Sequence, residues 1–364
     1  MTAKPNELKI SPIVSLPLQA EAKEFIPVAT EFIGQKKILE QIALGIVASK
    51  PVLLIGDTGV GKTSAIRYLA ALTKNGFRRL NLNGQTGTEE IIGKILLQNG
   101  STYWVDGVLI DAMRKGYWIL LDEINAASPE VLFAIHSLLD DDGYIVLSEH
   151  SGEIVKPHPH FRLFAAMNPS GDYAGTKEMN QALISRFYVV KLEHPVPAIE
   201  QQILKNRAGI TEKAAEEMVA FAGEVRKMKR DEKIQFTLST RELIQWAELW
   251  KQYRRKYLIS AEMAILNKLA AHEISSVTTL LGLRFKKLDG GKTEVVTLEA
   301  DKPIEVGAKV EVISGGYGSS KPGSVGIVMK VGSRYTVEFT KLTGDPAPLP
   351  ATYDNINPVD VKRI

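Results

Sequence analysis

The sequence contains no cysteine among its 364 residues. Disulfide bonds, thiolate catalysis, iron–sulfur clusters and cysteine-ligated zinc are therefore excluded, and a reducing compartment is favoured. The chain also lacks an apolar run of the roughly 18 to 20 residues that a membrane-spanning helix needs. Its first residues lack the apolar stretch of a signal peptide. These absences favour a cytoplasmic protein that does not contact a membrane.

The sequence also lacks a large excess of charge of either sign. The 45 basic and 42 acidic residues leave a net charge of +3, which is too balanced to indicate nucleic-acid binding. Hydrophobic residues make up 45% and charged residues 24% of the chain, as is ordinary for globular proteins. The length predicts two or three packed domains, but the composition leaves the chemistry open.

The pattern of residues changes along the chain and predicts five segments. Residues 1–25 indicate an extended arm, and 196–286 show helical spacing only. A linker at 287–301 precedes strands and glycine-rich turns at 302–364, which predict a small all-β barrel. In residues 26–195, helical segments alternate with short β-like runs, which predicts an α/β domain with a parallel sheet covered by helices on both faces. The β-like runs are Val52–Ile55, Arg79–Leu82, Tyr117–Leu121, Arg162–Ala166 and Tyr188–Leu192.

A glycine-rich loop follows the first of these runs and precedes a helical segment at residues 64–72. It has the pattern G-x-x-x-x-G-K-[ST] of a phosphate-binding loop, or Walker A motif, and consists of Gly56, Asp57, Thr58, Gly59, Val60, Gly61, Lys62 and Thr63. Backbone N–H groups of such a loop cradle phosphate oxygens, and the helix N-terminus adds partial positive charge. Lys62 is expected to reach the β- and γ-phosphates, and the Thr63 hydroxyl to hold Mg²⁺. We therefore expect a nucleotide-binding site here.

Two acidic residues follow the apolar run Tyr117–Leu121. Ligands of open α/β sheets bind at the carboxyl ends of the strands, where Asp122 and Glu123 are expected to lie. Asp122 would hold Mg²⁺ through its water shell, and Glu123 would polarise the attacking water. The alternative is a strand that ends in a solvated acidic turn.

Asn168 follows another apolar run, Phe161–Met167. At the tip of a neighbouring strand, its amide could orient the lytic water or bind the γ-phosphate. The alternative is an asparagine that begins a turn before Pro169.

These motifs together resemble those of the AAA+ ATPases. The segments that carry the resemblance are Gly56–Thr63, Ile119–Asn125 (ILLDEIN) and Phe164–Pro169 (FAAMNP). Residues 107–140 resemble the branch that contains MoxR, CbbQ/NorQ and midasin, and the resemblance covers about residues 26–250. It implies a P-loop NTPase core with an all-helical lid, ATP and Mg²⁺ as ligands, and ATP hydrolysis as the activity.

The resemblance also implies roles for single residues. Asn168 matches the polar sensor-1 residue, and Arg186 matches the arginine finger that reaches the γ-phosphate of a neighbouring subunit. Arg241 sits where the sensor-2 arginine opens a lid helix, and Ile33 belongs to a linker, residues 27–34, that packs on the adenine. The alternative for Arg186 is a surface arginine that caps a helix, and for Arg241 an ordinary arginine in the first turn of a helix. For Ile33 the alternative is packing in the core.

Two β-hairpins are expected at positions where this branch carries insertions. Residues 95–104 turn at Asn99-Gly100, which is a strong hairpin dipeptide, and residues 144–155 turn at Ser151-Gly152. In ring-shaped relatives both elements face the pore or the substrate. Tyr103 and Trp104 would grip a substrate there, or they pack on the hairpin itself.

The C-terminal segment resembles an SH3-like or KOW-type barrel. Such barrels bind peptides, proteins or nucleic acids, and the fold alone does not decide among them. Basic and acidic residues nearly balance in it, so it shows no electrostatic footprint for a phosphate backbone. Its tyrosines, Tyr317, Tyr335 and Tyr353, either form a stacking face or are half-buried in the barrel.

The expected function is that of a ring-forming, MoxR-type AAA+ ATPase that remodels or activates a partner protein. Because Arg186 would complete the site of a neighbour, the resemblance implies a homo-oligomer, with a hexameric ring as the expected form. It also implies a client with a von Willebrand A domain. One alternative is an ATPase motor that grips DNA or RNA with the barrel, against which the balanced charge argues. Another is a barrel that docks the ring on a protein, with ATP binding as an assembly switch.

Overall fold

The structure is a computed structural model, and it describes residues 7–12, 14–19, 24–141, 143–169 and 179–289. It also describes the backbone of strands at 309–312, 325–330, 335–341, 351–356 and 361–363. The chain divides into two compact units, Met1–Lys292 and Thr293–Ile364. The domain limits expected from the sequence stay predictions.

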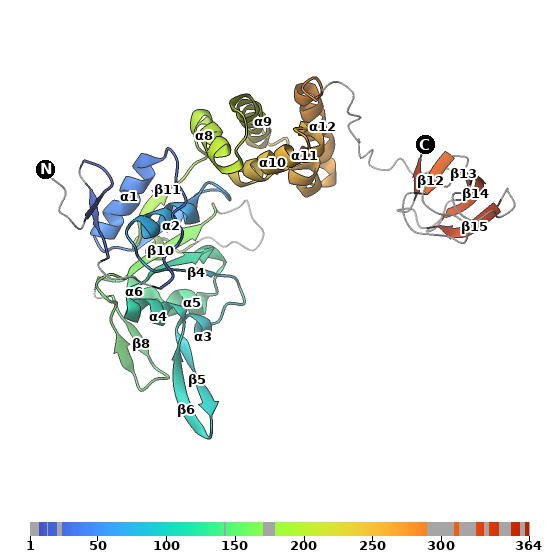
Figure 1. The fold of residues 1–364 in the computed structure, drawn as a ribbon. Helices are drawn as coiled ribbons and strands as arrows, with labels where there is room; N and C mark the ends of the chain where they lie inside the picture. Colours follow the sequence, from blue (N-terminus) through green and yellow to red (C-terminus); the bar gives the residue numbers. More distant parts are fainter. Residues whose placement is uncertain are drawn as a thin grey trace. The chain divides into compact units, whose positions relative to one another are not determined.

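The first unit is built on a five-stranded sheet with the order β11-β3-β10-β7-β4 (Figure 1). Its strands are β3 (Val52–Ile55), β4 (Phe77–Asn81), β7 (Trp118–Asp122), β10 (Arg162–Met167) and β11 (Tyr188–Lys191), and all neighbours run parallel. The predicted parallel sheet is thereby confirmed. Parallel neighbours place their carboxyl ends at one edge, so the segments that follow β3, β7 and β10 meet there.

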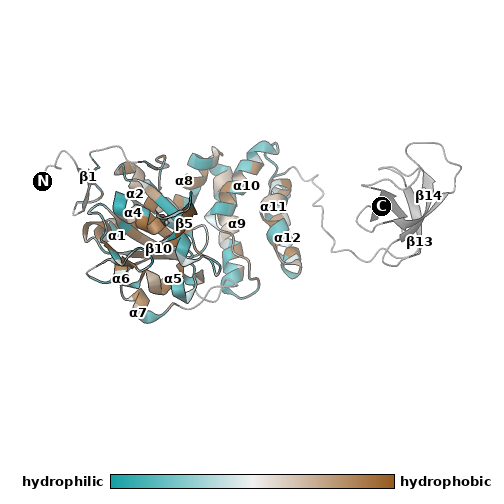
Figure 2. Ribbon diagram, turned by 90° about the horizontal axis from the view of Figure 1, so that it is seen from below, coloured by the Kyte–Doolittle hydropathy of each residue, from teal (hydrophilic) through white to brown (hydrophobic). Residues whose placement is uncertain are grey.

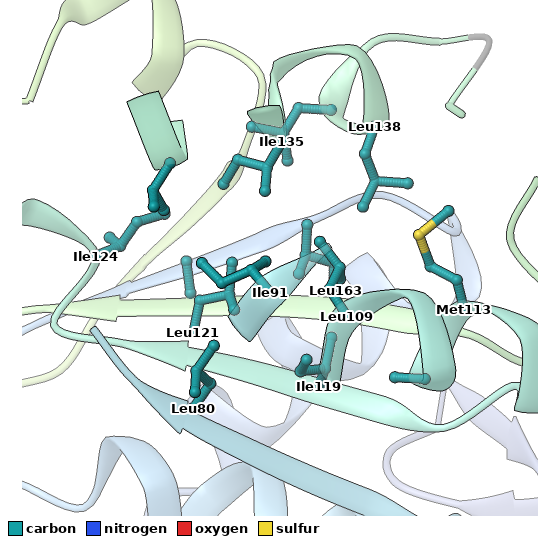
Figure 3. Close-up of a cluster of buried hydrophobic side chains, with 14 of the residues drawn as sticks. Leu80, Ile91, Leu109, Met113, Ile119, Leu121, Ile124, Ile135, Leu138 and Leu163 are labelled. Atoms are coloured by element: carbon teal, nitrogen blue, oxygen red, sulfur yellow. The ribbon is translucent and has the colours of Figure 1, made fainter. Parts of the chain in front are cut away.

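Alternate residues of the central strands enter separate hydrophobic clusters on the two faces of the sheet. In β7, Ile119 and Leu121 belong to one cluster, whereas Trp118 and Leu120 belong to the other. Figure 3 shows part of the first cluster, which contains Ile119 and Leu121 of the sheet together with Leu109. Figure 2 shows the brown of hydrophobic residues along β10. This burial on both faces explains why β-like runs of the sequence are almost continuously apolar.

Helices cover both faces. On one face lie α1 (Lys36–Val47) and α2 (Lys62–Leu72), whose apolar residues join the cluster that contains Trp118. The other face is covered by four short helices, α3 (Thr88–Ile91), α4 (Val108–Lys115), α5 (Pro129–Ala134) and α6 (His136–Leu139). A 3-10 turn, η1 (Ile124–Ala126), follows β7, and α7 (Gln181–Ile184) precedes β11.

Two hairpins extend the core, and both agree with the sequence prediction. Strands β5 (Gly93–Gln98) and β6 (Ser101–Asp106) pair antiparallel and project from the sheet in Figure 1. Strands β8 (Ile145–Leu147) and β9 (Glu153–Val155) form the second hairpin. Both predicted turn dipeptides have positive φ at both residues, as type I′ turns require.

The two aromatic residues of the first hairpin, Tyr103 and Trp104, have different environments. The Trp104 indole donates to Asp106 Oδ1 at 2.7 Å and stacks on the His150 ring with centroids 5.3 Å apart. Trp104 therefore packs between the two hairpins, whereas Tyr103 is 44% exposed.

Residues 7–17, expected within an extended arm, contain a small antiparallel hairpin of β1 (Glu7–Lys9) and β2 (Ser15–Pro17). Leu16 of β2 is fully buried with the α1 side of the core. The described part of the arm is thus attached to the α/β domain.

The helical lid is confirmed beyond residue 196. Its helices are α8 (Pro197–Ala208), α9 (Glu212–Arg230), α10 (Thr240–Gln252), α11 (Tyr257–Ala264) and α12 (Ala271–Phe285), with a 3-10 turn η2 (Leu266–Lys268). They gather in one group in Figure 1. Their core is an aromatic cluster in which Trp246 contacts Phe221 and Phe285 edge-on, with ring centroids 5.5 and 5.3 Å apart.

The second unit contains a five-stranded sheet with the order β15-β14-β13-β12-β16, in which all neighbours are antiparallel. The strands are β12 (Lys309–Val312), β13 (Val325–Lys330), β14 (Tyr335–Lys341), β15 (Ala351–Ile356) and β16 (Val361–Arg363). The expected SH3-like or KOW-type barrel stays a prediction, because its turns and side chains, those of the three tyrosines included, lie outside the described residues. Within the described part of the chain, no helix is long and apolar enough to cross a membrane.

Candidate functional site

A cavity of about 490 Å³ lies at the carboxyl edge of the sheet, between the α/β domain and the first turns of α10. Most of the residues singled out in the sequence line it. They are Ile33, Thr58, Gly59, Val60, Gly61, Lys62, Thr63, Asp122, Glu123, Asn168 and Arg241. Gly56 and Asp57 lie at the base of the same loop, and Arg186 does not belong to the lining.

The glycine-rich loop joins β3 to α2 and leaves the first turn of α2 open. Gly61 caps this helix in the left-handed region with φ of +101° and, lacking a side chain, makes no capping bond to the first N–H groups. Gly59 also has a positive φ, of +78°, a conformation that favours glycine. The uncapped N–H groups and the helix dipole form a ready site for an anion such as a phosphate group.

Lys62 is the first residue of α2, and its side chain reaches back to the start of this loop. Its Nζ donates to the backbone oxygens of Gly56 at 2.5 Å and Asp57 at 2.9 Å, and to Asn168 Oδ1 at 2.8 Å. Burial is the main cause that lowers the pKa of Lys62 to about 8, against the opposing pull of the Asp122 and Asp57 carboxylates. A buried ammonium group held on weak acceptors is well prepared to exchange them for phosphate oxygens.

Asp122 ends β7 and lies opposite Thr63. Its Oδ2 accepts from the Thr63 hydroxyl at 3.2 Å, and its Oδ1 accepts from the Glu123 backbone N–H at 3.2 Å. A hydroxyl and a carboxylate are oxygen ligands of the kind that Mg²⁺ prefers. The structure thus brings the two predicted Mg²⁺ ligands together.

Glu123 has a strained backbone and an exposed side chain. Its φ of +56° lies in the left-handed region, which non-glycine residues rarely adopt and which often marks functional sites. The residue lines the cavity beside Asp122. A solvent-accessible carboxylate at this point can act on a water molecule next to bound phosphate.

Asn168 follows β10, the strand between β3 and β7. Its amide oxygen accepts from Lys62, and its backbone oxygen accepts from Asn125 Nδ2 at 3.4 Å. The side chain therefore points toward the phosphate loop, as a polar sensor would. It does not simply begin a solvent-exposed turn.

The lid and the N-terminal linker close the cavity from two other sides. Arg241 lies in the first turn of α10, which begins with a capping box of Ser239 and Glu242. A Cβ placed on Gly59 would lie 2.4 Å from Ser239 Oγ, so the phosphate loop and α10 are in close contact. Ile33 lines the cavity with Phe32, which lies near Gly61.

Arg186 lies after α7 and is bound elsewhere. Its Nε donates to Asp140 Oδ1 at 2.6 Å, and its Nη1 donates to the Ala182 backbone oxygen at 2.6 Å. Its side chain retains 27% of its exposure. Within one chain, Arg186 therefore does not reach the cavity that contains Lys62.

The sequence interpretation missed Arg79 of β4. Its Nε and Nη2 lie 2.9 and 2.7 Å from Asp122 Oδ2, and it lines the cavity. The one signal in the sequence is a charged residue at the start of a β-like run. This signal does not identify Asp122 as the partner of Arg79, because their contact depends on β4 lying beside β7.

A buried polar network in the lid was missed as well. Glu200 of α8 is fully buried, and its two oxygens accept from Arg226 of α9 at 2.8 Å each. Thr240, next to Arg241, donates to Glu200 Oε1 at 2.6 Å. The network joins three lid helices behind the cavity.

Comparison with known families gives two adjacent matches. Residues 51–187 match the AAA domain (dynein-related subfamily), and residues 200–282 match the CbbQ/NirQ/NorQ C-terminal region. The first match contains the phosphate loop, the acidic pair and Asn168, and the second contains most of the lid.

Individual relatives cover the same part of the chain. Midasin of Dictyostelium discoideum is 36% identical over 221 residues, which are 58% of this chain and 4% of that protein. Protein NorQ of Paracoccus denitrificans is 31% identical over 202 residues, 56% of this chain and 74% of NorQ. An uncharacterised protein of Staphylococcus aureus is 31% identical over 192 residues, 51% of this chain and 72% of its own length. The chain thus spans most of NorQ but a very small part of midasin.

Proposed function

The chain belongs to the dynein-related AAA family of ATPases, in the group that includes NorQ, and from this we infer that it hydrolyses Mg²⁺-bound ATP to remodel or activate a partner protein. The observation that carries the proposal is the convergence of Lys62, Thr63, Asp122, Glu123 and Asn168 on one cavity. They come from the three segments that follow β3, β7 and β10, and each has the chemistry that phosphoryl transfer to water requires.

The residues fit a Mg²⁺ ion that arrives with phosphate. The Thr63 hydroxyl and the Asp122 carboxylate lie 3.2 Å apart. No group of three or more His, Cys, Asp or Glu side chains suited to a metal occurs among the described residues. A site with few protein ligands suits Mg²⁺, which is usually held by one or two protein groups plus substrate phosphates. Bound there, Mg²⁺ would neutralise the charge that develops on the phosphate oxygens.

The remaining residues take roles set by their positions. Lys62 and the open N-terminus of α2 bind the phosphates, and Phe32 and Ile33 offer an apolar surface to the base. Glu123 accepts the proton of the attacking water, and Asn168 orients that water or the terminal phosphate. Arg241 brings positive charge from the lid.

We further propose that the protein acts as a ring, with a hexamer as the expected size. The support is the position of Arg186, outside its own cavity and bound to Asp140. An arginine supplied by a neighbour would complete the positive charge around the phosphates.

We propose a partner protein as the client and do not identify it further. A von Willebrand A domain in the client, docking through the C-terminal barrel and a cytoplasmic location are predictions from the resemblance and the composition. Nucleic acid as the client is not proposed, because no observation on the described residues favours it.

Replacing Glu123 by Gln tests the proposal. The amide keeps the size of the side chain but cannot accept the proton, so ATP hydrolysis is expected to fall by at least about 100-fold, the lower range for a general base. Binding of a fluorescent ATP analogue is expected to stay within about threefold of wild type, because Glu123 is not a phosphate ligand. Glu149→Gln, in the exposed turn of the second hairpin, is the matched control. Retained hydrolysis in Glu123→Gln would remove Glu123 from the proposed role.

A further inference from the structure

Arg79 holds the carboxylate that is expected to serve Mg²⁺. It lies on β4 opposite Leu120 of β7, and Asn81 lies opposite Asp122. Arg79 and Asp122 are therefore diagonal neighbours on the same face of the sheet. The guanidinium directs two nitrogens at one oxygen, Asp122 Oδ2, at 2.9 and 2.7 Å.

Two further contacts hold the Asp122 carboxylate. Oδ2 also accepts from Thr63, and Oδ1 accepts from the Glu123 N–H. Asp122 is only 7% exposed, and a buried carboxylate without partners is costly. Without a cation, Arg79 supplies the positive charge that this carboxylate needs.

The same contacts oppose a cation. A Mg²⁺ ion held by Thr63 and, through water, by Asp122 would draw on the same carboxylate that the guanidinium binds, and the two positive charges would repel each other. The Arg79 side chain is 49% exposed and lines the cavity. It can leave Asp122 without burying its charge, and phosphate oxygens are suitable new acceptors.

We propose that Arg79 is the counter-ion of Asp122 in the nucleotide-free site and yields this carboxylate to Mg²⁺ when the nucleotide is bound. Arg79 is then a positioning residue that sets the Mg²⁺ concentration at which the site loads. The inference rests on the proposed function, since it takes Thr63 and Asp122 as the Mg²⁺ ligands.

The test measures nucleotide binding, without hydrolysis, on the full chain. Fluorescent N-methylanthraniloyl-ATP is titrated into wild type and Arg79→Gln, first in EDTA and then at increasing Mg²⁺. The Mg²⁺ concentration that gives half of the Mg²⁺-dependent gain in affinity is expected to be roughly tenfold lower in Arg79→Gln, the factor for about one charge-assisted hydrogen bond. The melting temperature without nucleotide is expected to fall in the variant, and saturating Mg²⁺ and nucleotide are expected to reduce that difference.

Arg78 provides the matched control. It is the next residue of β4, but its guanidinium lies over the Phe25 ring at 4.6 Å and 3.7 Å from Asp111. Arg78→Gln is expected to keep the wild-type Mg²⁺ midpoint. Arg79→Lys keeps the charge with a single nitrogen and is expected to lower the midpoint about threefold, so it tests the inference even if the Gln variant does not fold.

The outcomes separate the inference from the proposed function. If Arg79→Gln and Arg79→Lys bind the analogue with an unchanged or raised Mg²⁺ midpoint, the exchange at Asp122 is wrong and the proposed function stands. If wild type binds no ATP analogue at any Mg²⁺ concentration, the proposed function fails and the inference fails with it.

Discussion

The side-chain oxygen of Asn168 lies 2.8 Å from the Nζ of Lys62, although the two residues are 106 positions apart in the sequence. The contact joins the phosphate loop after β3 to the end of β10. It fixes the lysine at the floor of the cavity and leaves it positively charged below its shifted pKa. Two consequences of this arrangement can be measured by changing pH or the loop itself.

Lys62 is expected to make stability depend on pH in the alkaline range. Its pKa is about 8 in the folded protein, lowered mainly by burial from the ordinary lysine value of 10.5. Between these values the unfolded chain binds more protons, so the free energy of unfolding rises with pH in this window. Below pH 8, folding bears the full cost of the buried charge. The Lys62→Met variant lacks this contribution.

The measurement is urea unfolding of wild type and Lys62→Met from pH 7 to pH 10.5, followed by tryptophan fluorescence. The 4 tryptophans of the sequence all lie in the first unit, so the signal reports that unit. The unfolding free energy of wild type minus that of the variant is expected to rise by about 2 to 3 kcal/mol over this range. A difference that does not change with pH would contradict the buried charge.

Gly59 is expected to couple the phosphate loop to the lid. A Cβ at this position would lie 2.4 Å from Ser239 Oγ, and φ is +78°. Gly59→Ala is expected to cost about 1 to 2 kcal/mol of stability from the backbone alone and to weaken nucleotide binding as α10 is displaced. Gly84→Ala, where a Cβ meets nothing within 4 Å, is the control and should be nearly neutral.

The two causes in Gly59→Ala can be separated. Adding Ser239→Gly removes the contact but leaves the positive φ, so it is expected to restore part of the nucleotide affinity and little of the backbone cost. If Gly59→Ala binds nucleotide as tightly as Gly84→Ala does, the loop and the lid are not coupled at this point.

Arg186 is expected to act on a neighbouring subunit. Arg186→Ala should still bind nucleotide, because the residue lies outside its own cavity, but ATPase activity should fall at least about 1,000-fold, the lower range for an arginine finger. Lys50→Ala is a matched control, since Lys50 forms an ion pair with Asp141, next to the Arg186 partner Asp140. Activity regained on mixing Arg186→Ala with Lys62→Ala would show action in trans. Full activity of Arg186→Ala alone would exclude the role.

The features that the sequence predicted well are local ones. The phosphate loop needs its glycines and lysine within eight successive positions. The strand β7 is indicated by five apolar or aromatic residues before Asp122. Hairpin turns follow from dipeptides such as Asn99-Gly100. In each case, the physical cause of the structure lies within a few residues of the chain.

The features that the sequence did not reveal depend on long-range neighbours. Arg79 reaches Asp122 only because β4 lies at the edge of the sheet beside β7, and strand order is not a local property. Glu200 finds Arg226 and Thr240 on two other helices. Arg241 was placed at the cavity by resemblance to a family and not by its own spacing.

The buried network of Glu200 is expected to be a main support of the lid. The Glu200 side chain is 1% exposed and Arg226 is 11% exposed. Removing the negative charge in Glu200→Gln leaves the arginine uncompensated, which is expected to cost about 3 kcal/mol. The exposed pair of Lys205 and Glu212 lies nearby, so Glu212→Gln should cost less than about 1 kcal/mol.

A double variant distinguishes loss of an ion pair from general damage to the lid. Replacing both Glu200 and Arg226 by Met removes the charges together, so this variant is expected to lose less stability than Glu200→Gln, because no buried charge is left without a partner. Urea unfolding followed by tryptophan fluorescence measures all four proteins, with wild type as the reference. Equal losses for Glu200→Gln and Glu212→Gln would show that the network does not hold the lid. Thr240 donates to Glu200 and precedes Arg241. Weaker nucleotide binding in Glu200→Gln would therefore show that the buried network also positions the residues of the cavity.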